Sequence, residues 1–235
     1  MSKKNIPLTL CLTSLLLLLS CKNAPEDLIT PDGVRCANLP AHKAHLLEQN
    51  HPLIIQGTLH SLPTPQASLI PSLISTAHAY ALEQEKPLPN QTISLYYLDL
   101  RHPTTLPEPA LSTTTNKDGK FCIAAPSKPT TNQVILLQAT PDGTPTLRHI
   151  APYSFHANIN ATSEALTQLV IASPEDTRSN LSNTTLLNLQ TLAESRVGLL
   201  SPVKVTPDDS QKSLIQKISK TLQKDPQIQS LLKFN

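Results

Sequence analysis

The chain has 235 residues, which is enough for one large domain or two small ones. Its 19 basic and 17 acidic side chains nearly balance, so the composition excludes the strong positive field that recruits nucleic acid or anionic lipid. The 22 prolines, 5 glycines, 3 phenylalanines and 4 tyrosines favour long connections and edge strands around a modest core. Leucine and β-branched residues are too frequent for a wholly disordered chain.

Residues 1–20 have the three parts of a signal peptide. A basic start at residues 3–4 is followed by an apolar stretch from Leu8 to Leu19, and the small Ser20 precedes Cys21. The 12 residues of this stretch span about 18 Å as a helix, well short of the ~30 Å hydrocarbon core of a bilayer. The alternative, a buried core helix, has no amphipathic pattern in its favour. We therefore expect a cleaved targeting segment.

The sequence "LLSC", Leu18 to Cys21, resembles the lipobox of bacterial lipoproteins, which is an aliphatic residue, a variable residue, a small residue and a cysteine. The resemblance implies cleavage before Cys21, a lipid on its sulfur and an acylated new amine. Several acyl chains attach a protein lastingly, whereas one chain binds only marginally. Position 22 is Lys rather than Asp, so the resemblance implies anchoring in the outer membrane.

Two of the four cysteines remain for a disulfide. Cys11 leaves with the signal peptide and Cys21 carries the lipid, which leaves Cys36 and Cys122 in an oxidising compartment. A disulfide between them is the first expectation, and two unbridged thiols are the alternative. Zinc binding would need more ligands than two isolated cysteines supply.

Residues 21–50 are polar with scattered prolines and predict a lipidated tether that becomes ordered near Cys36, with a short helix within 40–50. A β region is expected over 51–155. Its first strand pattern, "PLIIQGTLHS", alternates apolar residues with Gln56, Thr58 and His60. Repeated prolines interrupt the pattern over 61–89, where the sequence is compatible with a helix or an ordered loop.

Further strands are expected in the rest of this region. "NQTISLYYLDL" places Ile93, Leu95 and Tyr97 on one face, and "QVILLQAT" is a short apolar run typical of a core strand. The segment "TPTLRHIAPYSFHANI" offers one or two more strands after a turn at residues 141–143.

"ALSTTTNKDGKFCIAAP" predicts strand, turn, strand, with the turn at Asn116–Gly119. Phe121 and Ile123 are expected to point inward, and Cys122 to lie on the other face. This segment, between flanking strands, resembles the carboxypeptidase regulatory-like module, a transthyretin-like fold. The resemblance covers about residues 50–155 and implies an antiparallel Greek-key β-sandwich that is non-catalytic and serves as a spacer or binding surface.

A helical C-terminal region is expected over 156–235, giving an α+β fold class. Ser163 is the expected N-cap of a first helix, with Glu164 in its first turn. A second helix is expected to end near Gly198. A third helix is expected in the amphipathic segment "PDDSQKSLIQKISKTLQ". A fourth helix is expected after Asp225, which would cap it. This region also resembles the C-terminal part of uncharacterised bacterial lipoproteins, a likeness that implies shared architecture and no activity.

The apolar face of the amphipathic segment contains four residues, and its lysines lie on the other side. The apolar residues are Leu214, Ile215, Ile218 and Leu222, and the lysines are Lys212, Lys217 and Lys220. The lysines are few and interspersed with uncharged residues, so we expect a solvated face rather than a lipid-binding one.

No catalytic, metal or cofactor site is expected from the motifs. His42 and His45, with Glu48 nearby, have helical spacing for one ion, but further ligands are not evident, so exposed histidines are the favoured interpretation. The acidic pairs Glu83 with Glu85 and Asp208 with Asp209 are interpreted as solvated charges. Neither Gly-x-Ser-x-Gly nor a phosphate-binding glycine run occurs.

The sequence therefore predicts a non-enzymatic envelope lipoprotein with a binding, structural or assembly role. Its expected partners are the membrane, through Cys21, and an envelope protein or cell-wall polymer, with no nucleic acid. One alternative is an accessory lipoprotein of a secretion or transport complex, which rests on fold analogy. The other is an envelope hydrolase whose site, either two carboxylates or a serine and a histidine, is assembled across the sandwich and helices only by the fold.

Overall fold

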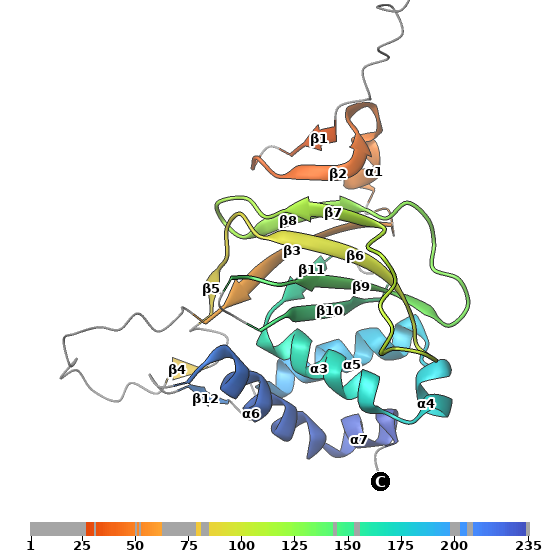
Figure 1. The fold of residues 1–235 in the computed structure, drawn as a ribbon, viewed down its shortest axis with the longest axis vertical. Helices are drawn as coiled ribbons and strands as arrows, with labels where there is room; N and C mark the ends of the chain where they lie inside the picture. Colours follow the sequence, from red (N-terminus) through yellow and green to blue (C-terminus); the bar gives the residue numbers. More distant parts are fainter. Residues whose placement is uncertain are drawn as a thin grey trace, which may run out of the picture.

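The computed structural model describes residues 27–30, 32–49, 51, 53–62, 79–80, 85–142, 145–152, 156–197, 203–205 and 209–233. These residues form two larger β-sheets and a set of helices gathered at one end of the molecule (Figure 1). The mixed α and β content that the sequence predicts is confirmed. The segment predicted to be a signal peptide, and Cys21, lie outside the described residues.

The larger sheet has six strands and contains both strand directions. Its path is β1-β2-β8-β3-β11, and β5 also pairs with β3. The strands are β1 (Asp27–Ile29), β2 (Arg35–Pro40), β3 (Ile54–Ser61), β5 (Lys86–Pro87), β8 (Lys120–Ala124) and β11 (His156–Ile159). β3 pairs with β8 in the antiparallel direction, but β2–β8 and β3–β11 are parallel pairs. The expectation of an entirely antiparallel sandwich is therefore wrong for these two pairs. Neither pair is joined by a tight turn, so neither is held to the antiparallel direction of a hairpin.

The second sheet has four antiparallel strands in the order β10-β9-β6-β7. They are β6 (Thr92–Asp99), β7 (Leu111–Thr114), β9 (Gln133–Ala139) and β10 (Leu147–Ala151). Four successive residues of β9, 134–137, are buried, so both faces of this strand are covered. The core strand expected from "QVILLQAT" is confirmed. In β6, Ile93 and Leu95 are fully buried as expected, whereas Tyr97 is half-buried and its hydroxyl donates to the carbonyl oxygen of Ser127 at 2.8 Å.

The expected turn at Asn116–Gly119 is present. The backbone N–H of Gly119 donates to the carbonyl of Asn116, whose side-chain oxygen accepts from Asp118 N and Lys120 N. Gly119 has φ +70°, a conformation that favours glycine. The turn does not close a hairpin, however, because β7 pairs with β6 and β8 pairs with β3. The chain thus crosses from one sheet to the other here, and this placement depends on contacts distant in sequence.

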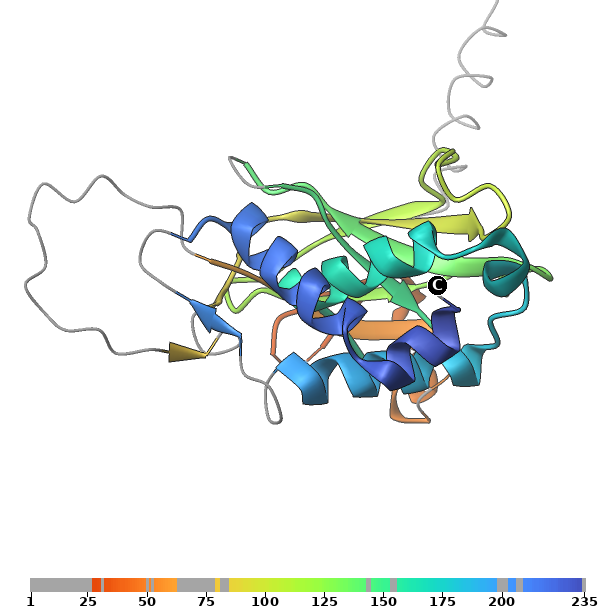
Figure 2. The ribbon, with the colours of Figure 1, turned by 90° about the horizontal axis from the view of Figure 1, so that it is seen from below.

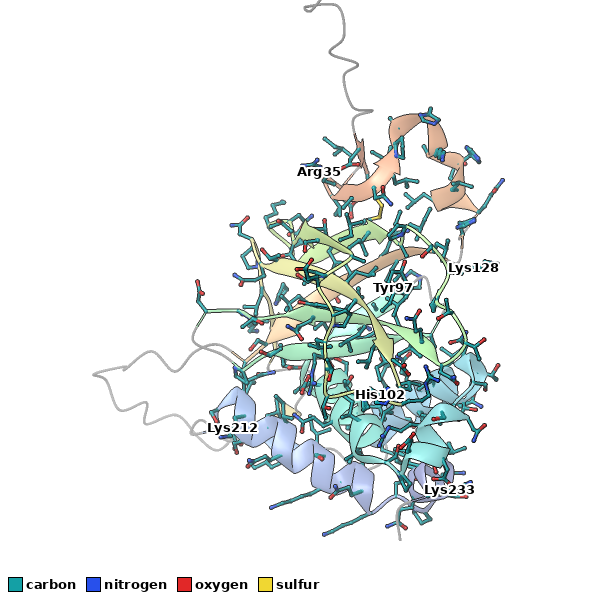
Figure 3. The ribbon with its side chains drawn as sticks, turned by 45° about the vertical axis from the view of Figure 1, so that its right-hand side comes forward. Arg35, Tyr97, His102, Lys128, Lys212 and Lys233 are labelled. Carbon is teal, nitrogen blue, oxygen red and sulfur yellow. A yellow bond between two sulfur atoms is a disulfide. The ribbon has the colours of Figure 1, made fainter. Side chains whose placement is uncertain are left out.

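The N-terminal segment is more ordered than the expected tether. β1 and β2 pair in the antiparallel direction, and Cys36 of β2 lies opposite Cys122 of β8 with a Cα–Cα distance of 4.4 Å. The predicted disulfide joins these two cysteines, and Figure 3 shows it beneath the strand that contains Arg35. The short helix expected within 40–50 is present as a 3₁₀ turn, η2 (Ala41–Lys43), followed by α1 (His45–Glu48). Pairing with β8 recruits the segment into the sheet and explains its order.

Two apolar clusters lie on opposite faces of the six-stranded sheet. The larger contains Phe121 and Ile123 and continues through the four-stranded sheet into the helices. The smaller contains Cys36, Cys122 and Ile54, with residues of the N-terminal segment. The alternation along β8 is therefore as predicted, and the N-terminal segment covers the face that Cys122 occupies.

The helices lie across the edge where β10 and β11 meet, as Figure 2 shows from below. They are α3 (Ala161–Ala172), α4 (Glu175–Ser179), α5 (Asn183–Ser195), α6 (Gln211–Gln223) and α7 (Pro226–Leu232). α3 contacts β10, β11, α5 and α6, so it joins the sheets to the other helices. The apolar face predicted for α6 is buried and Asp225 caps α7 with Pro226 at its first position, both as expected. Gly198 lies outside the described residues.

The N-cap expected at Ser163 is wrong. Asn160 caps α3 by accepting from Ser163 N, and the Ser163 hydroxyl in turn accepts from Asn160 N, which makes a reciprocal capping box. Ser163 is therefore the third residue of α3. The reason is that β11 ends at Ile159, so the next residue, Asn160, is still in an extended conformation and serves as the cap.

The proline-rich stretch 61–89 is described only at its two ends and at Ala79–Tyr80. Those two residues form β4, which pairs with β12 (Lys204–Val205), so they are strand rather than helix. The alternative of a helix elsewhere in 63–78 lies outside the described residues.

Candidate functional site

A row of polar side chains runs along the outer face of β3, β8 and β11, opposite the larger core. We call it the polar strip and define it as Gln56, Thr58, His60, Lys120, His156, Asn158 and Asn160. The alternation of β3 explains its direction, since Ile55 and Leu59 are buried in the core. The parallel register places His156 beside Gln56 and Asn158 beside Thr58, whose hydroxyl donates to Asn158 Oδ1 at 3.0 Å.

The close approach of β11 to β3 requires glycine at position 57. A Cβ at Gly57 would lie 2.0 Å from the carbonyl oxygen of Ala157 and 2.7 Å from Cζ of Phe121. Any side chain there would separate the two strands. Gly57 therefore permits the pairing that brings the β3 and β11 halves of the polar strip together.

A turn of the N-terminal segment, Thr30 and Asp32–Val34, forms a wall beside the polar strip. The Thr30 hydroxyl donates to Asp32 Oδ1, and Lys120 Nζ lies 2.8 Å from Asp32 Oδ2. The hydrogen bond from Lys120 lowers the pKa of the Asp32 carboxyl. A cavity of about 400 Å³ lies between this wall and the strands, with Thr30, Asp32, Gln56, Thr58, Lys120 and Asn158 among its lining residues. Since the disulfide holds the segment to β8, it also positions the wall.

A second cavity, of about 200 Å³, lies where β3 and β11 end. It is lined by His60, Glu85, Asn158 and Asn160, so Asn158 borders both cavities. Burial lowers the pKa of His60 and thus favours its neutral imidazole. Glu85 is 8% exposed, and burial raises the pKa of its carboxyl to about 7.

The interpretation of the acidic pairs as solvated is wrong for two of their residues. Glu85 is buried against α3 and α6, where its Oε1 accepts from Ala161 N at 2.9 Å and from Gln211 Nε2 at 3.1 Å. Asp209 is also buried, accepts from Ser213 Oγ and pairs with Lys217. Their burial depends on helices packing over them, which no local pattern reveals. Glu83 and Asp208 lie outside the described residues.

The described residues of the polar strip offer hydrogen-bond donors and acceptors. Each of the two cavities has one carboxylate among its described lining residues, Asp32 in the larger and Glu85 in the smaller. His42, His45 and Glu48 are exposed on η2 and α1, and no group of three or more potential ligands among the described residues is arranged to hold a metal ion.

The sequence revealed part of this site. The polar face of β3 follows from its alternation, whereas Glu85, Asn158 and Asn160 were missed because their neighbours are distant in sequence. A capping pattern at Asn160 was the one local signal available for them.

None of the helices in the described residues is both long and apolar enough to cross a membrane.

Comparison with known proteins identifies no family. No family model matches the sequence, and no curated protein does so. Among solved structures, part of the chain aligns with the N-terminal domain of the shaft pilin SpaA from Lactobacillus rhamnosus GG, with a TM-score of 0.27 and 16% sequence identity. The match covers 45% of this chain and 92% of that domain.

Proposed function

We propose that the protein is a non-enzymatic lipoprotein of the bacterial cell envelope that binds a cell-wall polymer through the polar strip. The observation that carries the proposal is the strip itself: polar groups from three strands lie on one face, with a cavity of about 400 Å³ over most of the strip and a smaller one at its His60 end. Binding sites combine such concavity with a few well-placed polar groups.

A lipid on Cys21 anchors the molecule to the outer membrane in this proposal. The support is the lipobox-like "LLSC" and its register with the basic and apolar parts of the signal peptide. Residues 22–26 separate Cys21 from β1, a length that reaches at most about 20 Å when extended. β1 lies at the end of the molecule opposite α3–α7 (Figure 1), so the lipid would hold that end near the bilayer.

We also propose that the two sheets derive from a transthyretin-like Greek-key sandwich. The strands β3, β6, β7, β8, β9 and β10 make only antiparallel pairs with one another, and the chain passes between the sheets at the 116–119 turn. In this interpretation β2 and β11 are additions, which explains why both parallel pairs involve them.

Fractionation tests the anchor. Cys21→Ala should move the protein from the membrane fraction to the soluble fraction, because the acylated sulfur is lost. Asn23→Ala is the control, since it changes a residue close to Cys21 in the sequence and leaves the lipidation position and both disulfide cysteines intact. Continued membrane residence of Cys21→Ala would overturn the anchoring part of the proposal.

Site-specific crosslinking tests the binding surface. A photo-crosslinking residue at Gln56, in the polar strip, should form adducts with cell-wall material in the intact envelope. The same replacement at Gln227 of α7 should not. Absence of any adduct at Gln56, with efficient incorporation shown by labelling, would overturn the strip as the binding surface.

The second candidate function is an accessory lipoprotein of a secretion or transport complex. The observation in its favour is an apolar groove of about 600 Å³ between α5 and α7, lined by residues that include Leu192, Pro226 and Leu231. Lys212 and Lys233 label this helical end in Figure 3, far from Arg35. Protein adducts at Gln227 without cell-wall adducts at Gln56 would favour this function.

A further inference from the structure

Buried carboxylates in the described part of the structure usually have a basic partner. Glu164, which is 2% exposed, forms a bidentate pair with Arg148. Asp209 pairs with Lys217, and Asp225 pairs with Arg196. This is expected, because burying a carboxylate without a compensating charge costs several kcal/mol or shifts its pKa.

Glu85 is the exception among these carboxylates. Its hydrogen bonds come from a backbone N–H and an amide, and both end on Oε1. No Lys or Arg among the described side chains pairs with it, and Oε2 has no partner among the described residues. The neighbouring Lys86 is exposed, and the stretches 63–78 and 81–84 contain no Lys or Arg. The side chain lines the smaller cavity of the polar strip.

The described residues that line the cavity with Glu85 supply hydrogen-bond acceptors, and none of them is a lysine or arginine. His60 faces the cavity from β3 in its neutral form, and Asn158 and Asn160 face it from the end of β11. Asn158 also donates to Glu194 of α5, an exposed residue whose carboxyl has a pKa raised by partial desolvation. Gln211 and the N-terminus of α3 are already engaged with Oε1. A positively charged group entering this cavity would meet a carboxylate, amide oxygens and an imidazole nitrogen.

We propose that the cavity beside Glu85 binds a protonated primary amine of a hydroxyl-rich ligand, such as an amino sugar, with the ammonium group on Glu85 Oε2. An ammonium group has three donors, which the carboxylate, an amide oxygen and the imidazole can accept. A metal ion suits the site less well, because no group of three or more metal-binding side chains is present among the described residues. The hydroxyl groups would contact Asn158 and Thr58, and longer ligands would continue along the polar strip. This inference rests on the proposed function of the strip.

Calorimetric titration of the mature lipidated protein in detergent at pH 7 tests the proposal. The probes are D-glucosamine, D-glucose and N-acetyl-D-glucosamine, of which only the first has an amine that can be protonated. Glucosamine should bind at least about tenfold more tightly than either neutral sugar, the advantage of one charge-assisted hydrogen bond. Equal affinities for the three sugars would overturn the proposal.

Glu85→Gln should remove that preference and leave glucose binding within about twofold, because an amide retains the oxygen but not the charge. Glu48→Gln, on exposed α1, makes the same residue replacement away from the cavity and should preserve the preference. In the unmodified protein, carboxyl NMR should show the pKa of Glu85 falling when glucosamine binds but not when glucose binds. An unchanged pKa would contradict the contact even if the variant failed to fold.

The two proposals fail differently. Cell-wall adducts at Gln56 without a preference for glucosamine would support the proposed binding function but refute the amine-binding role of the cavity. A glucosamine preference that depends on Glu85, without adducts at Gln56, would support the cavity and remove the strip as the cell-wall surface.

Discussion

Replacing Glu85 with glutamine should make the protein more stable at alkaline pH. The substitution removes a buried charge but keeps a side-chain oxygen where Ala161 N and Gln211 Nε2 donate. Burial raises the pKa of Glu85 from 4.5 to about 7, so the folded state binds this proton more tightly than the unfolded state. The free energy of unfolding therefore decreases as pH rises from 4.5 through about 7.

The pKa rise sets the size of the effect. Each tenfold change in proton affinity is worth about 1.4 kcal/mol. The rise in the pKa of Glu85 therefore lowers the free energy of unfolding of the unmodified protein by about 3 kcal/mol above pH 8. Glu85→Gln lacks this loss. Its advantage in unfolding free energy should grow from near zero around pH 4.5 to about 3 kcal/mol at pH 8.5, as an upper value.

Urea unfolding at a series of pH values, with the disulfide intact, measures this difference. His149 contributes the opposite trend, because burial lowers its pKa to about 4 and its stabilisation is lost as pH falls from 6.5 through about 4. That contribution is common to both proteins and cancels in the difference. Glu48→Gln should give a flat difference. A flat difference for Glu85→Gln as well would refute the assignment of a buried, uncompensated charge.

Three further substitutions test the fold. Replacing Cys36 and Cys122 together with alanine should lower the free energy of unfolding by about 2–5 kcal/mol, since the bridge spans a sequence separation of 86 residues; urea unfolding that matches the unmodified oxidised protein would contradict this. Gly57→Ala should disrupt the β3–β11 pair, because its Cβ would lie 2.0 Å from the carbonyl oxygen of Ala157; hydrogen exchange at β11 amides should accelerate, and unchanged protection would be evidence against the close approach. Ile218→Ala should cost about 2–5 kcal/mol in thermal or urea unfolding, and a cost below about 1 kcal/mol would contradict its full burial in α6.

Local patterns in the sequence were sufficient for several elements. The alternation in β3, the apolar face of α6 and the Asp225–Pro226 start of α7 were each predicted, because each depends on residues within a few positions of one another. The disulfide was predicted by a different route, from the count of cysteines that remain after the signal peptide and the lipid are assigned.

Pairing between distant segments was decided only by the tertiary structure. β7 and β8 have the pattern of a hairpin, yet they join different sheets, and β11 pairs in parallel with a strand about a hundred positions earlier in the sequence. The same sequence pattern is compatible with several strand partners, and packing of the whole core selects among them.

In the candidate site, too, some properties of single residues follow from the sequence and others only from the tertiary structure. By itself, the sequence determined which side chains of β3 are polar and alternate outward. It could not determine that Glu85 is buried, because a charge is exposed or buried according to the helices that pack over it. Glu85 meets α3 and α6 through Ala161 and Gln211, contacts that exist only once the helices close over the end of β3. Its raised pKa, and the cavity beside it, are therefore properties of the fold rather than of the local sequence.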